Sequence, residues 1–383
     1  MFEVHSFQPM TQAQTLNLIE HLKQIPDYRK GKGKRHALWL VLTLVLLGTM
    51  CGYRGYRPLA DFSQQHWSTL CDLLELPANT RIPSYSTFRR ILHRVDFEPF
   101  ASLFNRWSQM FLKLMEETWV AADGKSIKST LSDYSQSYQN FITTVSAFTH
   151  ETGVVLHLQV MENKQTSEIE VVRQSIAALA GQPIVFTLDA LHCQKKTVDQ
   201  IIQQQQHYLI ALKANQLKLY RTLVQLHQTS ACLSEAQTFD PSHNRQVHRR
   251  VSVYAAPSLL KRHWSGLNTL IWVERWGVRD GQPFKEQIGY ISDLELSAIQ
   301  FLQHIQHHWH IENRLHWVRD VTFNEDHARP GGNAPVIWAI LNCFLMNIVR
   351  RLAYRTIPQG VRALANQVNQ VYEILTQGFP PPK

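Results

Sequence analysis

The stretch Val120-Ala-Ala-Asp123-Gly-Lys125 places a carboxylate directly after an apolar run that has the pattern of a β-strand. A second stretch, Phe186-Thr-Leu-Asp189-Ala-Leu-His192, repeats the arrangement. A third acidic residue, Glu312, stands within a helical pattern late in the chain. Carboxylates that follow neighbouring strands can meet at one edge of a sheet. There they can hold two divalent cations, an arrangement suited to phosphodiester chemistry.

The elements around the first two acids predict an α/β fold. Their order is three strands, a helix, a strand, a helix and a strand, at residues 118–122, 141–148, 154–161, 167–180, 184–188, 194–206 and 208–213. This is the order of a ribonuclease H-like core, in which the first and fourth strands are neighbours. We therefore expect Asp123 and Asp189 to lie side by side at the ends of those strands.

The chain divides into four predicted regions. They are an all-α N-terminal domain at 1–112, a ribonuclease H-like core at 113–213 and 295–355, a β-rich insertion subdomain at 214–294, and a C-terminal helix and tail at 356–383. The strand patterns of the insertion lie at 247–255, 267–278 and 284–291. The core helix that carries Glu312 must therefore return to the sheet after the insertion.

The composition is that of a folded, basic protein. The 383 residues are 44% hydrophobic, enough for substantial cores, and 39 Lys and Arg against 30 Asp and Glu give a net charge of +9. This excess favours a polyanionic partner. Five cysteines without a C-x-x-C pair argue against a disulfide framework or a zinc ribbon and fit a reducing cytoplasm.

The apolar run at residues 37–50 predicts a buried helix and not a membrane span. It has 14 residues, whereas about 20 are needed to cross a bilayer. The N-terminus also lacks the basic and apolar pattern of a secretory signal. We expect a cytoplasmic protein that does not associate with membranes.

Two basic segments precede the first strand. Residues 28–36 combine glycines with Lys30, Lys32, Lys34 and Arg35, a pattern that suits either a phosphate contact or a solvated loop. Residues 82–94 predict a helix capped by Ser84 or Ser86, with an apolar face and a basic one. The candidate contacts on the basic face are Arg89, Arg90, His93 and Arg94. This pattern fits both a helix-turn-helix recognition helix and an ordinary surface helix.

The helical pattern at residues 297–320 is rich in histidine. With 3.6 residues per turn, His308, Glu312 and Arg319 share one face of a regular α-helix. A neighbouring stripe holds Asn313, His316 and Asp320. Histidines at this density also suit a solvated helix or a zinc-binding helix, although the H-E-x-x-H order of a catalytic zinc helix is missing.

Several motifs in this order resemble one family. The string from His308 to Asp326 (HWHIENRLHWVRDVTFNED), together with Gly332-Asn-Ala-Pro335, is similar to the DDE transposases of bacterial insertion sequences, in the branch that includes the H-repeat-associated proteins. The segments at 122–125, 189–192 and 25–29 match the same branch, so the resemblance covers about residues 20–355.

The resemblance implies that Asp123, Asp189 and Glu312 form a catalytic triad that binds two Mg²⁺ or Mn²⁺ ions. It also implies cleavage and strand transfer on double-stranded DNA, namely transposon ends and target DNA, with end recognition by the N-terminal domain and a homodimer in the DNA complex. A broader group of these enzymes has Tyr, Arg, Glu and Lys around the third acid, where this chain has Ile305, His308, Glu312 and Arg319. Both His308 and Arg319 are candidate DNA contacts. Arg319 can still contact a phosphate, whereas His308 need not carry a charge at neutral pH.

Further candidate DNA contacts are Lys125 and His192. Lys125 either holds the scissile phosphate as a point charge or faces solvent. His192 orients Asp189 or a metal-bound water, or caps the following helix. Asn313 joins this group by its place in the motif. Two other functions fit the same residues. One is a related nuclease that cuts without strand transfer, and the other is a transposase-derived DNA-binding regulator that no longer cuts.

Overall fold

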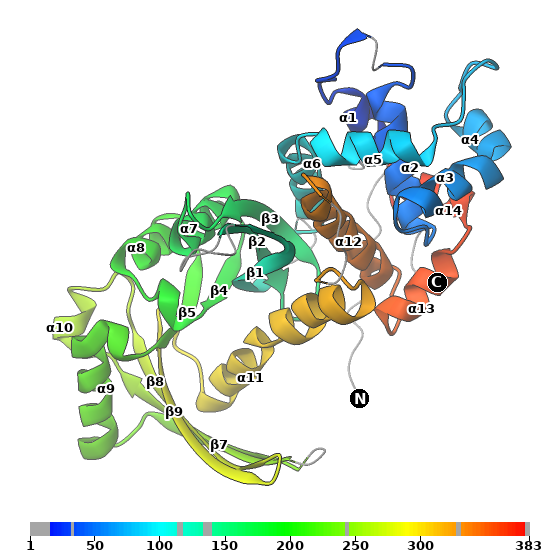
Figure 1. The fold of residues 1–383 in the computed structure, drawn as a ribbon. Helices are drawn as coiled ribbons and strands as arrows, with labels where there is room; N and C mark the ends of the chain where they lie inside the picture. Colours follow the sequence, from blue (N-terminus) through cyan, green and yellow to red (C-terminus); the bar gives the residue numbers. More distant parts are fainter. Residues whose placement is uncertain are drawn as a thin grey trace.

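One continuous sheet of nine strands runs through the molecule, and a helical region packs against one end of it (Figure 1). The structure is a computed structural model, and it describes residues 16–31, 34–112, 118–132, 140–241, 245–326 and 331–379. The chain is therefore a mixed α/β protein with an N-terminal helical region, as the sequence predicts.

The first five strands appear in the expected order along the chain. They are β1 (Thr118–Ser132), β2 (Asn140–Thr149), β3 (Val155–Glu162), β4 (Ile184–Leu188) and β5 (His207–Leu212), with helices α7 (Glu168–Ala178) and α8 (Lys195–Gln203) between them. The spatial order is β3-β2-β1-β4-β5. The pairs β1–β4 and β4–β5 are parallel, whereas β1–β2 and β2–β3 are antiparallel.

Strand β1 is longer than the sequence indicated. The expected strand ended at residue 122, but β1 continues ten residues further, to Ser132, because it stays paired with β2. Pairing with β4 stops earlier, at Ala121 and Thr187. Asp123 therefore lies within β1, at the point where the parallel part of the sheet ends.

The β-rich segment extends the same sheet and does not form a separate one. It contributes β6 (Ser234–Asp240), β7 (Arg245–Ala255), β8 (Thr269–Arg279) and β9 (Gln282–Ser292), with α9 (Leu217–Thr229) and α10 (Ser258–Lys261). The expected three strands correspond to β7, β8 and β9. Strand β9 pairs antiparallel with β5, which gives the order β5-β9-β8-β7-β6.

Helix α11 (Ala298–His308) crosses the sheet where the two halves join (Figure 1). Its residues Phe301, Leu302 and Ile305 pack in one apolar cluster with Leu209 of β5 and with residues of β7 and β8. The capping box of Ser297 and Gln300 begins this helix. The packing fixes the direction in which the chain leaves α11 toward Glu312.

The helical region contains α1 (Leu18–Lys23), α2 (Leu38–Met50), α3 (Tyr56–Gln65), α4 (Trp67–Leu73), α5 (Tyr85–Arg94) and α6 (Glu98–Gln109). Every residue of α2 except Trp39 is buried, so the apolar run is a core helix as predicted. The predicted single C-terminal helix is wrong, because α13 (Ile357–Leu364) and α14 (Val368–Gln377) form two helices that return to this region. Lys32 lies outside the described residues.

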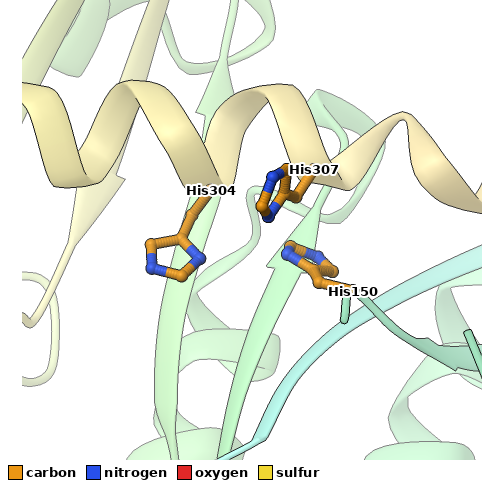
Figure 2. A group of neighbouring side chains, drawn as sticks. All are labelled: His150, His304 and His307. Carbon is orange, nitrogen blue, oxygen red and sulfur yellow. The ribbon is translucent and has the colours of Figure 1, made fainter. Parts of the chain in front are cut away.

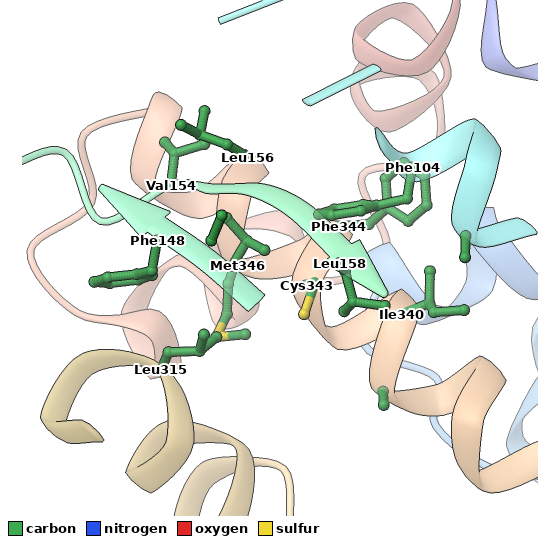
Figure 3. Packing of buried hydrophobic residues seen from close by; sticks show 14 of the residues in the cluster. Phe104, Phe148, Val154, Leu156, Leu158, Leu315, Ile340, Cys343, Phe344 and Met346 are labelled. Atoms are coloured by element: carbon green, nitrogen blue, oxygen red, sulfur yellow. The ribbon is translucent and has the colours of Figure 1, made fainter. Parts of the chain in front are cut away.

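Helix α12 (Ala334–Arg351) joins the helical region to the sheet. Among the described residues it is the one helix long and apolar enough to cross a membrane, and 83% of it is buried within the fold. Its Phe344 packs edge-on against Phe104 of α6, with ring centroids 4.9 Å apart. Figure 3 shows Ile340, Phe344 and Met346 lying against β2 and β3. The burial and these contacts are those of a core helix.

Helix side chains complete the outer edge of β3. The side-chain amide of Asn347 accepts from the Val155 backbone N–H (2.9 Å) and donates to the Val155 carbonyl (2.8 Å). Asn105 of α6 makes the same pair of bonds with Leu158, at 2.8 and 2.9 Å. An open strand edge exposes backbone groups that other strands can pair with. Here two amides satisfy that edge and tie both helices to the sheet.

Replacing Asn347 with leucine should therefore lower the free energy of unfolding by about 2–4 kcal/mol, because a buried N–H and a buried C=O of Val155 lose their partners. Urea unfolding followed by circular dichroism measures the difference. Asn215→Leu is the control, since Asn215 makes a single part-buried bond to a loop carbonyl. A loss below about 0.5 kcal/mol in Asn347→Leu would show that this edge does not depend on the amide.

Candidate active site

The structure brings Asp123 and Glu312 together from distant parts of the chain. Oxygen atoms of these two residues and a ring nitrogen of His316 all lie within 4.8 Å of one another. Nδ1 of His316 is 2.8 Å from Glu312 Oε2 and 3.7 Å from Asp123 Oδ2. A buried imidazole thus stands between two carboxylates.

Asp189 flanks this group without belonging to it. The parallel register of Ala121 with Thr187 places Asp123 level with Asp189, two residues further along each strand. The Asp189 carboxylate accepts from the backbone N–H of Leu191 at 2.9 Å and is 57% exposed. Asp123 and Asp189 therefore lie side by side, as expected, and Asp189 is the more exposed of the two.

Glu168 is a fourth acidic residue that the sequence did not single out as functional. It begins α7, and its Oε1 lies 3.4 Å from Nε2 of the fully buried His192, which is also 3.7 Å from Asp189. A side chain at Gly124 would bring a Cβ within 2.8 Å of Glu168 Oε2. Because Gly124 has no side chain, the Glu168 carboxylate can approach β1 next to Asp123. The only sequence signal, Ser167-Glu168, marked a helix start.

The segment that carries Glu312 is not the regular α-helix that the sequence predicted. Helix α11 ends at His308, and two π-helical segments follow, Ile311–His316 and Val318–Thr322. Hydrogen bonds from i to i+5 give wider turns than 3.6 residues. Glu312, His316 and Asp320, at spacings of four, consequently share the side that faces β1.

Arg319 points away from that side, so its predicted DNA contact is wrong for this structure. It is fully buried, donates to Glu325 (2.9 Å) and donates to the Thr144 hydroxyl (2.8 Å). Arg319 follows Glu312 by seven residues. In an α-helix seven residues make nearly two turns, but in the wider π-helix they make only about one and a half, so Arg319 lies opposite Glu312. The guanidinium holds the segment on the sheet.

The remaining candidates of the motif lie around the carboxylates. Lys125, 8% exposed, pairs with Asp320 at 2.6 Å. His308 bonds the Thr187 hydroxyl at 3.0 Å, and burial lowers its pKa to about 4, so its ring is neutral at pH 7. His308 therefore offers no positive charge to a phosphate. Asn313 is exposed beside Glu312.

Burial and the neighbouring charges alter the protonation of Asp123. Burial is the main cause that raises its pKa to about 6, and the charges of Glu168 and Asp189 add to it, while His316 opposes it. The hydrogen bond from His316 lowers the pKa of Glu312. Oxygen donors whose mutual repulsion a cation would relieve fit Mg²⁺ or Mn²⁺. Asp123 and Glu312, with His316 between them, could hold such an ion, and Asp189 lies beside this group.

The two basic segments of the helical region form a single groove of about 930 Å³. Its lining includes Lys30 and Arg35 from the loop and Arg90 and Arg94 from α5. Lys34 and Arg89 are exposed on the same elements. Ser84 stands at the N-cap position of α5, but its side chain makes no capping hydrogen bond. The amphipathic pattern of α5 is confirmed, because Phe88, Ile91 and Leu92 are buried. The sequence did not predict that loop and helix share one groove.

Comparisons with known proteins identify the family of this chain. Residues 115–348 match the family described as "Transposase DDE domain", and residues 19–108 match the one described as "DDE_Tnp_1-associated". The chain is 27% identical to "Putative transposase YncI" of Escherichia coli O157:H7, over 87% of each chain. It is 27% identical to "H repeat-associated putative transposase YhhI" of Escherichia coli K12, over 87% of this chain and 90% of that one. The resemblance predicted from the motifs is confirmed.

The raised pKa of Asp123 predicts a stability change with pH. Because the folded carboxyl binds its proton up to about pH 6 and the unfolded one only to about 3.8, metal-free protein should lose stability as pH rises between these values. A shift of two pKa units is worth about 3 kcal/mol. Because the Asp123 side chain is 36% exposed, screening by solvent reduces the expected stability change to about 1–2 kcal/mol.

Asp123→Asn should remove this slope and be more stable than the wild type by that amount at pH 7.5, with little difference near pH 4. Urea midpoints measured across pH 4–8 in EDTA give the comparison. Asp280→Asn, an exposed turn residue, is the matched control. Parallel pH profiles for the wild type and Asp123→Asn would contradict the interpretation.

Proposed function

Because this chain belongs to the transposase DDE domain family, we propose that it is a DNA transposase. It binds the terminal inverted repeats of its own insertion sequence, cuts the phosphodiester backbone at the ends, and joins them to target DNA. The observation that carries the proposal is the meeting of Asp123 and Glu312, with Asp189 alongside, where the parallel strands end. The order β3-β2-β1-β4-β5 supports a ribonuclease H-like core.

Mg²⁺ or Mn²⁺ held by Asp123, Asp189 and Glu312 would supply Lewis-acid chemistry, which activates a hydroxyl nucleophile and stabilises the leaving oxygen. The protein residues set the positions of these ligands. His316 donates to Glu312 and lies beside Asp123, so one buried ring orients both carboxylates. His192 lies 3.4 Å from Glu168 and 3.7 Å from Asp189, although neither of its ring nitrogens makes a hydrogen bond in the described part of the chain.

Lys125 and Asn313 are the residues suited to contact the DNA backbone at the cut. The Lys125 ammonium is held next to the carboxylates by Asp320, so the scissile phosphate would meet a fixed positive charge. Asn313 is exposed beside Glu312 and presents an amide that can bond to phosphate or sugar oxygens. Direct readout of end sequence belongs to another part of the molecule.

The groove between the 28–36 loop and α5 is suited to bind the transposon ends. It gathers Lys30, Arg35, Arg90 and Arg94 along one cavity, and phosphate contacts of this kind supply most of the affinity for DNA. We assign end binding to residues 1–112 and catalysis to 113–213 with 295–355. Holding two ends at once calls for a homodimer in the DNA complex. The protein acts in the cytoplasm.

Replacing a metal ligand should abolish cleavage and leave DNA binding intact. Asp123→Asn and Glu312→Gln each remove a charge worth several kcal/mol in the transition state, so cleavage should fall about a thousandfold or more. The substrate is a duplex that ends in the inverted repeats flanking the reading frame, and strand breaks and joined products are resolved on denaturing gels. Asp280→Asn is the control.

Two results would decide against the proposal in different ways. Cleavage of matched ends without any joined product would favour a nuclease. Binding without cleavage in the wild type would favour a regulator. The absence of inverted repeats in the DNA around the reading frame would contradict a mobile element.

Removing cations from the groove should weaken DNA binding in a salt-dependent way. In the double variant Arg90→Ala and Arg94→Ala, the plot of log DNA-binding constant against log salt concentration should have a slope shallower by about 2, because each lost phosphate contact reduces the slope by about 0.9. Fluorescence anisotropy between 50 and 300 mM salt measures the slope. The control is Arg262→Ala, because Arg262 is an exposed residue at the end of α10, far along the chain from the groove. An unchanged slope would place the DNA elsewhere.

A further inference from the structure

Three histidines meet on the side of β4 that faces α11. His304 and His307 lie one turn apart on α11, and His150 follows β2 (Figure 2). Ring nitrogens of all three lie within 4.8 Å of one another. Figure 2 shows His304 and His307 projecting from α11, with the ring of His150 below that of His307. The rings of His150 and His307 are nearly perpendicular, with centroids 6.1 Å apart. The carboxylate site uses none of these residues.

Each ring carries a buried nitrogen without a partner. The Nδ1 atoms of His150, His304 and His307 make no hydrogen bond in the described part of the chain, and His150 is fully buried. Buried polar atoms are hydrogen-bonded in the large majority of cases, because leaving them unpaired costs free energy. Each ring thus has an unpaired buried nitrogen, and each places a ring nitrogen within 4.8 Å of the other two, which indicates that something binds there.

Neighbouring groups already fix the orientations of the rings. Nε2 of His150 bonds the Thr187 hydroxyl at 2.8 Å. His304 stacks on Trp119 with centroids 3.5 Å apart, and His307 stacks on His310 at 4.6 Å. A bond to the second ring nitrogen and packing of the ring faces are what usually orient histidines that bind metals.

Burial keeps the three rings neutral at physiological pH. It lowers the pKa of His304 to about 4 and holds the pKa values of His150 and His307 below their ordinary range, with the neighbouring histidines adding to the effect. The neutral imidazole is the form that binds metal ions. Each neutral ring has one nitrogen with a free lone pair, so the rings can bind a metal ion without first losing a proton.

We propose that His150, His304 and His307 form a second metal site, for a borderline transition-metal ion such as Zn²⁺ or Co²⁺. Three imidazole donors suit such ions, whereas Mg²⁺ and Mn²⁺ prefer oxygen. In a tetrahedral site two Zn–N bonds of about 2.1 Å hold their nitrogens about 3.4 Å apart, so the three rings would have to move closer together than the present limit of 4.8 Å when the metal binds. A fourth position is left for water.

The site would act as a clamp on the element that carries Glu312. The carbonyl of His150 accepts from His310 and from Arg314, each at 3.0 Å, so the turn after β2 already touches both sides of Glu312. Thr187 bonds His150 of the cluster and His308 next to the carboxylates. A metal that joins His150 to α11 would stabilise this junction. Its effect on cleavage rests on the proposed function.

Metal-free full-length protein titrated with Co²⁺ tests the site, since nitrogen-bound Co²⁺ of low coordination number absorbs visible light strongly. We expect one equivalent to bind with this absorption, and Zn²⁺ to displace it. His307→Gln and His304→Gln should each weaken binding about tenfold or more. Glu312→Gln and the exposed His263→Gln should leave it unchanged. Binding that survives in both cluster variants, or that is lost in Glu312→Gln, would overturn the proposal.

A measurement on the wild type removes any dependence on how the variants fold. X-ray absorption of Zn²⁺-loaded protein should show about three imidazole ligands, and Zn²⁺ should raise the melting temperature of the wild type while Mg²⁺ does not reproduce the rise. A spectrum dominated by oxygen ligands, or the absence of a bound equivalent, would refute the site. Cobalt binding by the histidines with no DNA cleavage would leave this site standing and reject the transposase proposal.

Discussion

The parallel pairing of β1 with β4 is the constraint on which the rest of the structure depends. Parallel neighbours need a crossover between them, and here β2, β3 and α7 supply it. The pairing places Asp123 level with Asp189. It ends at Ala121 and Thr187, so both carboxylates lie just beyond the last paired residues. The crossover also delivers Glu168, because α7 begins beside Gly124.

Like charges held this closely repel, and the protein offsets the repulsion with fixed partners. His316 shares a hydrogen bond with Glu312, His192 stands between Glu168 and Asp189, and Lys125 is paired with Asp320. These groups come from β1, the turn after β4 and the π-helical segment. The site is therefore only as well ordered as the contacts between those elements.

Packing of α12 against the sheet and the π-helical segment provides that order. Asn347 and Asn105 bind the edge of β3, and α12 spans from the helical region to β2 and β3 (Figure 3). Leu315 of the π-helical segment lies on the same core as Phe148 and Met346, while Arg319 is anchored to Thr144 and Glu325. The apolar contacts of Leu315 and the hydrogen bonds of the buried Arg319 guanidinium thus hold the segment that carries Glu312 in place.

The sequence by itself determined the strand and helix order, the positions of Asp123, Asp189 and Glu312, the buried nature of α2 and the basic face of α5. Each follows from the period of apolar residues or from a short motif, which are local properties of the chain. Tertiary structure alone decided the π-helical turns that bury Arg319, the approach of Glu168, the shared groove and the meeting of His150 with α11. Those outcomes depend on which distant segments pack together, and local periodicity carries no information about that.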